Sequence, residues 1–376
     1  MPRLFFSFLL TCFMTVGLAS LAANPVPFVN QPLVPVSVAP GNGAFVLTVN
    51  GTAFVPGTVV KWNGNALPTT FVSQSRLTAE VSASLVAQPG TASVTASSPP
   101  PGGGASNVAF LPIALSVGNI QFGADAGVGK GLFVGHVIAG DFNNDGKIDL
   151  AATFGNLDTY FKKSGIDILL GNGDGTFQHV QGRKTAAFPQ PAIGDFNGDG
   201  IPDLVAVGSF PFSLPIKLDV LLGNGDGTFQ HAREYTVGIS PMCGCGVPVV
   251  ADFNRDGKLD LAFSTQQGLA VFLGNGDGTF GSPIVNPISG MPSIGDFNGD
   301  GKLDLALAVA DSNGVSVALG NGDGSFTLAK VLNRPLVTSL ISADLNGDGR
   351  VDFGFVLNSG GSFGRSSVNI DLQTAP

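Results

Sequence analysis

The chain is predicted to be an all-β protein, a β-sandwich followed by a β-propeller of five four-stranded blades. Of its 376 residues, 54 are glycine, 44% are hydrophobic and only 12% are charged, a composition that favours short strands joined by tight turns over disorder. A nine-residue acidic pattern occurs five times, with first aspartates 54, 57, 44 and 48 residues apart. A period of this length indicates a solenoid or a propeller.

Residues 1–22 are predicted to be a secretory signal peptide. The stretch from Leu4 to Ala23 is almost wholly apolar, follows Arg3 and ends in small residues, so we expect cleavage near Ala22 or Ala23. The alternative is an uncleaved anchor, because a run of this length is able to span a bilayer. We therefore expect a secreted or cell-surface protein, with no membrane span once the leader is removed.

Residues 24–114 are predicted to form the sandwich, with the domain junction near Leu115. Short strands are expected over residues 45–49, 59–62, 77–81, 91–96 and 106–110. Asn63-Gly64 predicts a hairpin turn between the second of these and the residues that follow. Trp62, the single tryptophan, is interpreted as a core residue rather than as a platform for a sugar.

The sandwich segment resembles the immunoglobulin-like IPT/TIG family. The resemblance is carried by Ser37-Val38-Ala39-Pro40, the strand that follows it, Gly51-Thr52-Ala53-Phe54, and Gly57 before the next strand. It covers about 85 residues, and its motif is moderately specific. It implies a non-catalytic Ig-like β-sandwich that serves as a spacer or docking module.

Residues 116–376 are predicted to form the propeller. Each unit contains a strand, an acidic loop, a strand, a variable connection, a strand, a Gly-Asn-Gly-Asp-Gly turn and a last strand, and four strands make one blade. In the fourth unit the strands are expected over residues 292–294, 305–309, 315–319 and 325–331. The fifth unit lacks a fourth strand, so we expect residues 119–124 to close the ring beside residues 367–372. Two further, degenerate blades are the alternative, but 261 residues leave little room for them.

The acidic pattern reads D-x-N-x-D-G-x-x-D, which matches the first nine positions of a calcium loop of the EF-hand type. Positions 1, 3, 5 and 9 supply three carboxylates and one amide oxygen, while position 7 shares no side chain and is expected to offer its carbonyl. Positions 2 and 8 are apolar and are expected to anchor the loop in the core. The alternative is an acidic turn without metal, although three carboxylates in nine residues repel one another unless a cation lies between them.

The repeats resemble FG-GAP/VCBS repeats, the blades of integrin α-subunit propellers and of many bacterial secreted proteins. The resemblance is carried by Gly140-Asp141-Phe142-Asn143-Asn144-Asp145-Gly146 and its four relatives, and it spans residues 130–372. It implies one structural calcium ion in each loop, about five in all. With the position-7 carbonyls included, the expected metal ligands are Asp141, Asn143, Asp145, Lys147, Asp149, Asp195, Asn197, Asp199, Ile201, Asp203, Asp252, Asn254, Asp256, Lys258, Asp260, Asp296, Asn298, Asp300, Lys302, Asp304, Asp344, Asn346, Asp348, Arg350 and Asp352.

The second motif, Gly-Asn-Gly-Asp-Gly, is interpreted as a structural turn. It has one carboxylate and glycines that accept positive φ. Its aspartates, expected to be turn residues and not ligands, are Asp174, Asp226, Asp277 and Asp323.

Several function classes are excluded by what the chain lacks. It contains no G-x-S-x-G, no His-Glu-x-x-His and no phosphate loop, and no basic stripe suited to nucleic acid. The net charge of −9 is concentrated in the five loops, which hold fifteen of the 27 acidic residues. Cys243 and Cys245 are interpreted as a strained local disulfide or as inert thiols rather than as a zinc site.

These patterns predict a non-enzymatic, calcium-binding adhesion module that binds an extracellular protein or glycan, and a monomer. Its candidate binding surface consists of three long connections, residues 156–165, 208–217 and 234–246, because loops on a rigid scaffold often carry function. The alternatives are a lectin, which would need repeated sugar platforms, and a polysaccharide-active enzyme, which would need charged groups outside the loops.

Overall fold

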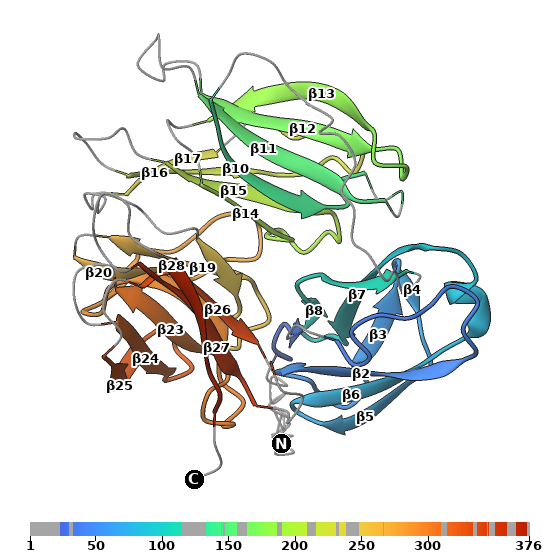
Figure 1. The fold of residues 1–376 in the computed structure, drawn as a ribbon. Coiled ribbons are helices and arrows are strands. Elements are labelled where there is room, and N and C mark those ends of the chain that lie inside the picture. The colour runs from blue at the N-terminus through green and yellow to red at the C-terminus, as the bar shows by residue number, and fades with distance from the viewer. Residues whose placement is uncertain are drawn as a thin grey trace, which may run out of the picture.

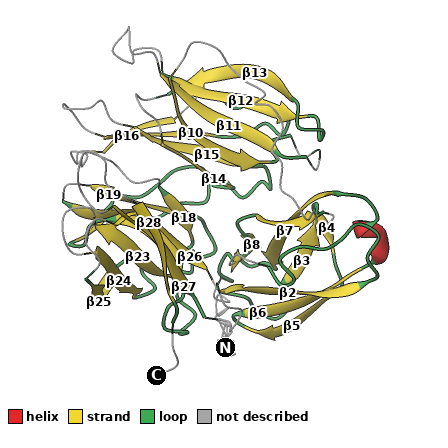
Figure 2. Cartoon of the chain, viewed as in Figure 1, coloured by secondary structure: helices red, strands yellow, loops and turns green. Residues whose placement is uncertain are grey.

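The structure is a computed structural model of the whole chain. The residues described are 23–29, 33–114, 133–143, 145, 147–155, 164–185, 190–208, 216–230, 233–237, 248–265, 267–309, 314–333, 337–343, 345, 350–358 and 366–373. Within them the chain forms β-strands and a short 3₁₀ helix, η1 (Ala83–Val86). No helix in this part of the chain is both long enough and apolar enough to cross a membrane. The all-β prediction is confirmed (Figure 2).

Two sheets around one core form the N-terminal domain, called the sandwich below. One sheet has the order β1-β2-β6-β5, and the other has the order β4-β3-β7-β8 with β9 also paired to β7. The bounds are β1 (Phe28–Val29), β2 (Phe45–Thr52), β3 (Val59–Trp62), β4 (Asn65–Ala66), β5 (Thr69–Ser73), β6 (Arg76–Val81), β7 (Gly90–Ser98), β8 (Gly104–Ala105) and β9 (Ala109–Ile113). Alternating apolar residues from both sheets meet in the core, as expected where each sheet exposes its other face.

Most of the local predictions for the sandwich are confirmed. Asn63 and Gly64 have φ of 48° and 77°, which suits a two-residue hairpin turn between β3 and β4. Trp62 is 1% exposed and belongs to the core. The last predicted strand, residues 106–110, is wrong by several residues. Ser106 and Asn107 instead use their side chains to bind backbone groups, and the strand begins at Ala109.

The repeats form five separate antiparallel sheets, four with four strands and the fifth with three described strands. The first four sheets are β10 (Phe133–Gly140), β11 (Asp149–Gly155), β12 (Gly165–Gly171) and β13 (Phe177–Lys184); β14 (Gln190–Gly194), β15 (Asp203–Gly208), β16 (Ile216–Leu221) and β17 (Arg233–Val237); β18 (Val249–Ala251), β19 (Asp260–Thr265), β20 (Gly268–Phe272) and β21 (Ile284–Asn286); and β22 (Met291–Gly295), β23 (Asp304–Val309), β24 (Gly314–Gly320) and β25 (Phe326–Leu332). The fifth consists of β26 (Val337–Ala343), β27 (Asp352–Asn358) and β28 (Ser366–Asp371). The strands predicted for the fourth unit agree with β22 to β25 to within one residue.

Successive sheets pack face to face, so that the repeat region is a stack of β-sheets (Figure 1). In the described part of the chain, four apolar clusters fill the four spaces between consecutive sheets. An edge-to-face aromatic pair crosses three of these spaces, as in Phe142–Phe229, whose ring centroids are 5.9 Å apart. Such pairs contribute about 0.5–1.5 kcal/mol each beyond their burial. Each repeat therefore depends on its neighbour for a complete core.

Ring closure is not observed among the described strands. The strand predicted to complete the last blade, residues 119–124, lies outside the described residues, as do all of residues 115–132. On β28 the outer face carries exposed Val368 and Ile370. The closed five-bladed ring therefore stays a prediction.

Candidate metal centres

The five acidic loops occupy equivalent places in the five sheets. They comprise residues 141–149, 195–203, 252–260, 296–304 and 344–352, and are called the first to fifth loops. Each loop joins the first strand of its sheet to the second, and its ninth residue is the first residue of that second strand. In the fifth loop only Leu345 and residues 350–352 are described, so the predicted ligands Asp344, Asn346 and Asp348 lie outside the described residues.

In the first four loops the first aspartate organises the turn through backbone hydrogen bonds. In the second loop, the Asp195 carboxylate accepts N–H groups from Gly198, Asp199 and Gly200 at 2.8, 3.1 and 2.8 Å. The Asn197 side chain accepts the Asp199 N–H at 3.0 Å. The sequence folds this way locally because Asx side chains accept N–H groups two or more residues ahead, and because glycine tolerates the positive φ of 82° at Gly200.

The ninth aspartate has a role that the sequence interpretation missed. In the first sheet, Asp149 accepts the Phe142 N–H at one carboxylate oxygen and the Gly171 N–H at the other, both at 2.8 Å. Gly171 begins the second turn, so this carboxylate ties the two turns of one sheet together. The glycine is required there because a Cβ would lie 2.1 Å from the carbonyl oxygen of Ile148. The same pair of bonds occurs in every sheet, through the fully buried Asp149, Asp203, Asp260, Asp304 and Asp352.

In the last sheet Gln373 occupies the position that the first glycine of the second turn has in the other sheets. Its N–H donates to Asp352 at 2.7 Å, where a turn glycine donates in the other sheets. Its side-chain amide donates to the carbonyl of Phe297 in the preceding loop at 2.7 Å. In the second sheet a turn glycine makes the equivalent bond, from the Gly227 N–H to the Phe142 carbonyl at 3.1 Å. No motif in the sequence signals this substitution.

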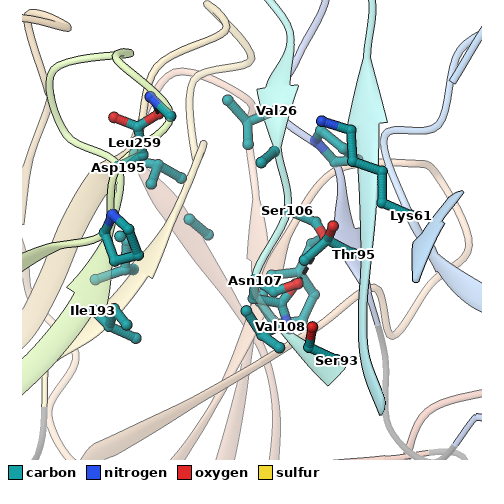
Figure 3. Close-up of a pocket in the computed structure, with 18 of the residues that line it drawn as sticks. Val26, Lys61, Ser93, Thr95, Ser106, Asn107, Val108, Ile193, Asp195 and Leu259 are labelled. Atoms are coloured by element: carbon teal, nitrogen blue, oxygen red, sulfur yellow. Dashed lines mark hydrogen bonds between the residues drawn. The ribbon is translucent and has the colours of Figure 1, made fainter. Parts of the chain in front are cut away.

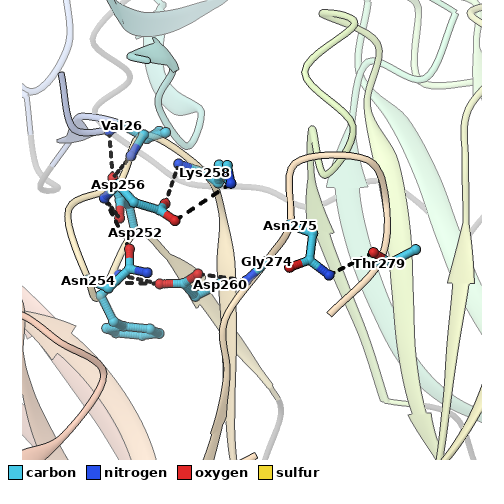
Figure 4. Close-up of polar contacts among 11 residues, drawn as sticks. Val26, Asp252, Asn254, Asp256, Lys258, Asp260, Gly274, Asn275 and Thr279 are labelled. Carbon is cyan, nitrogen blue, oxygen red and sulfur yellow. Dashed lines mark hydrogen bonds and ion pairs between the residues drawn. The ribbon is translucent and has the colours of Figure 1, made fainter. Parts of the chain in front are cut away.

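The third loop is covered by the sandwich (Figure 4). The Val26 N–H donates to Asp252 Oδ2 at 2.9 Å, and the Gly257 N–H donates to the same oxygen at 2.9 Å. Asp252 is consequently only 3% exposed, although the first aspartates of the first, second and fourth loops are half-buried. This contact joins residues 226 positions apart, so no local pattern predicts it.

Burial raises the pKa of the first aspartate in the second to fourth loops and of the ninth aspartate in the first to fourth loops. Burial is the main cause and the neighbouring loop carboxylates add to it; together they raise the pKa of Asp203 and Asp304 to about 6 and that of Asp260 to about 7. Burial likewise raises the pKa of Asp252 to about 6. Crowded, desolvated carboxylates favour a proton or a bound cation, either of which removes the repulsion between them.

The donor set fits a hard cation such as calcium, which prefers carboxylate, amide and carbonyl oxygens. A carboxylate offers about four lone-pair sites, so the backbone hydrogen bonds do not exhaust its oxygens. Yet among the described residues no three His, Cys, Asp or Glu side chains are placed together to hold a metal ion. At position 5, the Asp145 carboxylate instead pairs with the Lys147 ammonium at 3.2 Å. Cation binding would require these side chains to reorient.

The predicted role of the second turn is confirmed. Asp174 Oδ1 accepts the N–H and the hydroxyl of Thr176 at 2.9 and 2.6 Å. Asp226, Asp277 and Asp323 make the same two bonds. The hydrogen bond from the Thr176 hydroxyl is the largest cause that lowers the pKa of Asp174. These aspartates are turn residues.

Other predictions are borne out in part. The position-2 phenylalanines are 1 to 8% exposed, as expected of core anchors, whereas Leu345 is 37% exposed. Most of the three long connections, together with Cys243 and Cys245, lies outside the described residues.

The fold and the loops define a class of protein: an all-β repeat protein with one Asp-rich loop in each sheet. A model of the FG-GAP-like repeat matches residues 141–206, 217–263, 252–307 and 296–355, together more than half of the chain. The chain therefore belongs to the FG-GAP-like repeat family. No curated protein matches it.

Three solved structures resemble the chain over most of its length. A lectin from Agrocybe aegerita, described as recognising non-reducing terminal N-acetylglucosamine, has 19% identity and a TM-score of 0.43, covering 89% of this chain and 91% of its own. A rhamnogalacturonan lyase from Bacillus licheniformis has 16% identity and a TM-score of 0.41, covering 93% and 68%. An auxiliary nutrient-binding protein from Bacteroides ovatus has 11% identity and a TM-score of 0.36, covering 91% and 85%. At these scores no argument rests on the likenesses.

Proposed function

We propose that the protein is an exported, non-enzymatic binding module in which about five structural calcium ions stabilise a β-propeller that presents its loops to an extracellular protein or glycan. One observation carries the proposal: the same set of carboxylates recurs from sheet to sheet, and in the second to fourth loops burial raises the pKa of both the first and the ninth aspartate. A repeat that only needed turns would not retain three carboxylates in each loop.

Different positions of each loop would anchor the loop and bind the cation. The ninth aspartates and the position-2 residues hold each loop to its sheet, as the hydrogen bonds of Asp203 to Phe196 and Gly223 illustrate. The carboxylates and amides at positions 1, 3 and 5, with the position-7 carbonyl, would hold the cation, which would neutralise them. Export is proposed on the apolar leader, and an Ig-like spacer role for the sandwich on its two-sheet core.

Calcium removal and ligand screening test the two halves of the proposal together. At calcium concentrations one to ten times the dissociation constant, five filled sites would add about 2–7 kcal/mol to the free energy of unfolding. We expect the mature chain, residues 24–376, to melt at a lower temperature in EDTA. We also expect its binding to a glycan array or to an extracellular protein fraction to require calcium.

A matched pair of variants separates metal loss from general damage. Asp195→Asn should lower the number of calcium ions bound by one, as measured by calorimetric titration. Asp226→Asn, in an exposed second turn, should leave that number unchanged. An identical melting temperature with calcium and with EDTA would contradict the metal half of the proposal, and hydrolysis or elimination of an arrayed polysaccharide would contradict the non-enzymatic half.

A further inference from the structure

A cavity of about 250 Å³ lies between the sandwich and the first three loops. Figure 3 shows its two walls, with Lys61, Thr95 and Ser93 on the sandwich side and Ile193 and Leu259 on the side of the repeats. The walls are held together at the N-terminal segment. There Val26 donates to Asp252, and Phe28 packs against the core between the third and fourth sheets.

The sandwich wall carries the cavity's positive charge. Lys61 on β3 and Thr95 on β7 are directly paired across the sheet, and both are half-buried. In the described part of the chain, the Lys61 ammonium has no ion-pair partner. Ser93, two residues before Thr95, is held through its N–H and hydroxyl by Asn63. A half-buried ammonium beside a hydroxyl is suited to hold an anionic group.

The opposite wall combines apolar side chains with loop carboxylates. It is built from Ile193 at the end of β14, Val250 on β18 and Leu259 in the third loop, all half-buried. Asp141, Asp195 and Asp252 also line this wall, and backbone N–H groups donate to the carboxylates of Asp195 and Asp252. The cavity is thus amphipathic, with the free cation on one wall and, on the other, hydrocarbon beside three loop carboxylates.

We propose that this cavity binds a small amphiphilic carboxylate, with the carboxylate on Lys61 and Thr95 and the apolar tail against Ile193, Val250 and Leu259. The volume matches this class. An apolar cavity of about 150 Å³ accommodates benzene, so about 250 Å³ has room for a tail of about six to eight carbons. Asp141, Asp195 and Asp252 line the wall of the repeats, and their carboxylates would oppose a ligand that entered with its own carboxylate toward that wall.

The test is calorimetric titration of the mature chain with octanoate, in calcium buffer. The expected dissociation constant is about 1 mM or tighter for a ligand of this size. Octylamine and octanol, which share the tail, should bind at least tenfold more weakly because neither offers an anion to Lys61. Tighter binding of octylamine than of octanoate would overturn the proposal.

Variants place the ligand in the cavity. Lys61→Met should weaken octanoate binding roughly ten- to hundredfold, the range for a lost hydrogen bond to a charged group, and Lys61→Arg should retain most of it. Thr95→Phe, which keeps a good strand residue but fills the space, should abolish it. The matched control is Lys330→Met on exposed β25, which should change nothing.

Two outcomes would exclude this site. The first is octanoate binding that Lys61→Met and Thr95→Phe leave unchanged, because the ligand would then lie elsewhere. The second is binding that EDTA abolishes while Lys61→Met does not, because the carboxylate would then bind a loop cation directly. If the protein binds octanoate but no calcium, the result would contradict the proposed calcium-binding function and leave the cavity proposal standing.

Discussion

The second and third loops have the same sequence pattern and share most of their internal hydrogen bonds, yet they have different surroundings. In both, the ninth aspartate is fully buried between two backbone N–H groups. Gly200 in the second loop has open space beside it, whereas a Cβ on Gly257 in the third would lie 2.6 Å from the carbonyl oxygen of Asn24.

This difference shows that one repeat motif serves two purposes. The second loop is a turn that closes its own sheet, and its first aspartate stays accessible. The third loop is in addition the attachment point of the sandwich, because Val26 donates to Asp252 and the Asn24 backbone lies against Gly257. If the loops hold cations, the third is expected to couple cation binding to the position of the sandwich.

The largest expected effect comes from the feature that both loops share. Asp260→Asn and Asp203→Asn each place an amide where a carboxylate accepts two buried N–H groups, so at least one donor loses its partner. We expect each to lower the free energy of unfolding by about 2–4 kcal/mol, as measured by urea denaturation. Asp277→Asn, in an exposed turn, is the control and should cost less than about 1 kcal/mol. A tolerated Asp260→Asn would show that the buried carboxylate does not hold the two turns together.

The glycine at position 6 distinguishes the two loops directly. Gly200→Ala and Gly257→Ala carry a similar backbone penalty of about 1 kcal/mol, because φ is 82° at Gly200 and 83° at Gly257. Only the Cβ of Gly257→Ala would meet the Asn24 carbonyl. This clash should lower the free energy of unfolding by about 1–3 kcal/mol more, the typical cost of overpacking. Gly257→Ala should also speed proteolysis between the sandwich and the repeats. Equal losses in the two variants would contradict the docking contact.

The last expected effect is a pH dependence of the metal-free protein. The pKa of Asp260 rises from 3.8 to about 7 and that of Asp252 to about 6, mainly through burial. Because these groups bind protons more tightly in the folded state than in the unfolded state, their contribution to stability is fully present below about pH 4 and is lost as the pH rises through 6 to 7. Melting temperatures in EDTA should therefore fall over this range, and less so in Asp260→Asn. A rise over the same range would show that the carboxylates are stabilised as anions without metal.

Much of the local structure was predictable, and for clear reasons. The hairpin at Asn63-Gly64, the strands of the fourth unit and the second turns depend on contacts between residues a few positions apart. The buried phenylalanines at position 2 follow from their apolar character in an otherwise polar loop. The end of the sandwich was predicted less well, because Ser106 and Asn107 bind backbone groups with their side chains and delay the last strand.

The sequence by itself determined the repeat, the turns and the set of oxygen donors in each loop, since these follow from residue type and short spacing. Only the tertiary structure decided that the ninth aspartate joins two turns, that the Gln373 N–H donates to Asp352 in place of a turn glycine and that Val26 covers Asp252. Each of these contacts joins segments at least 14 residues apart, and backbone N–H groups, which every residue except proline possesses, supply most of the donors. The sequence pattern therefore does not predict these contacts.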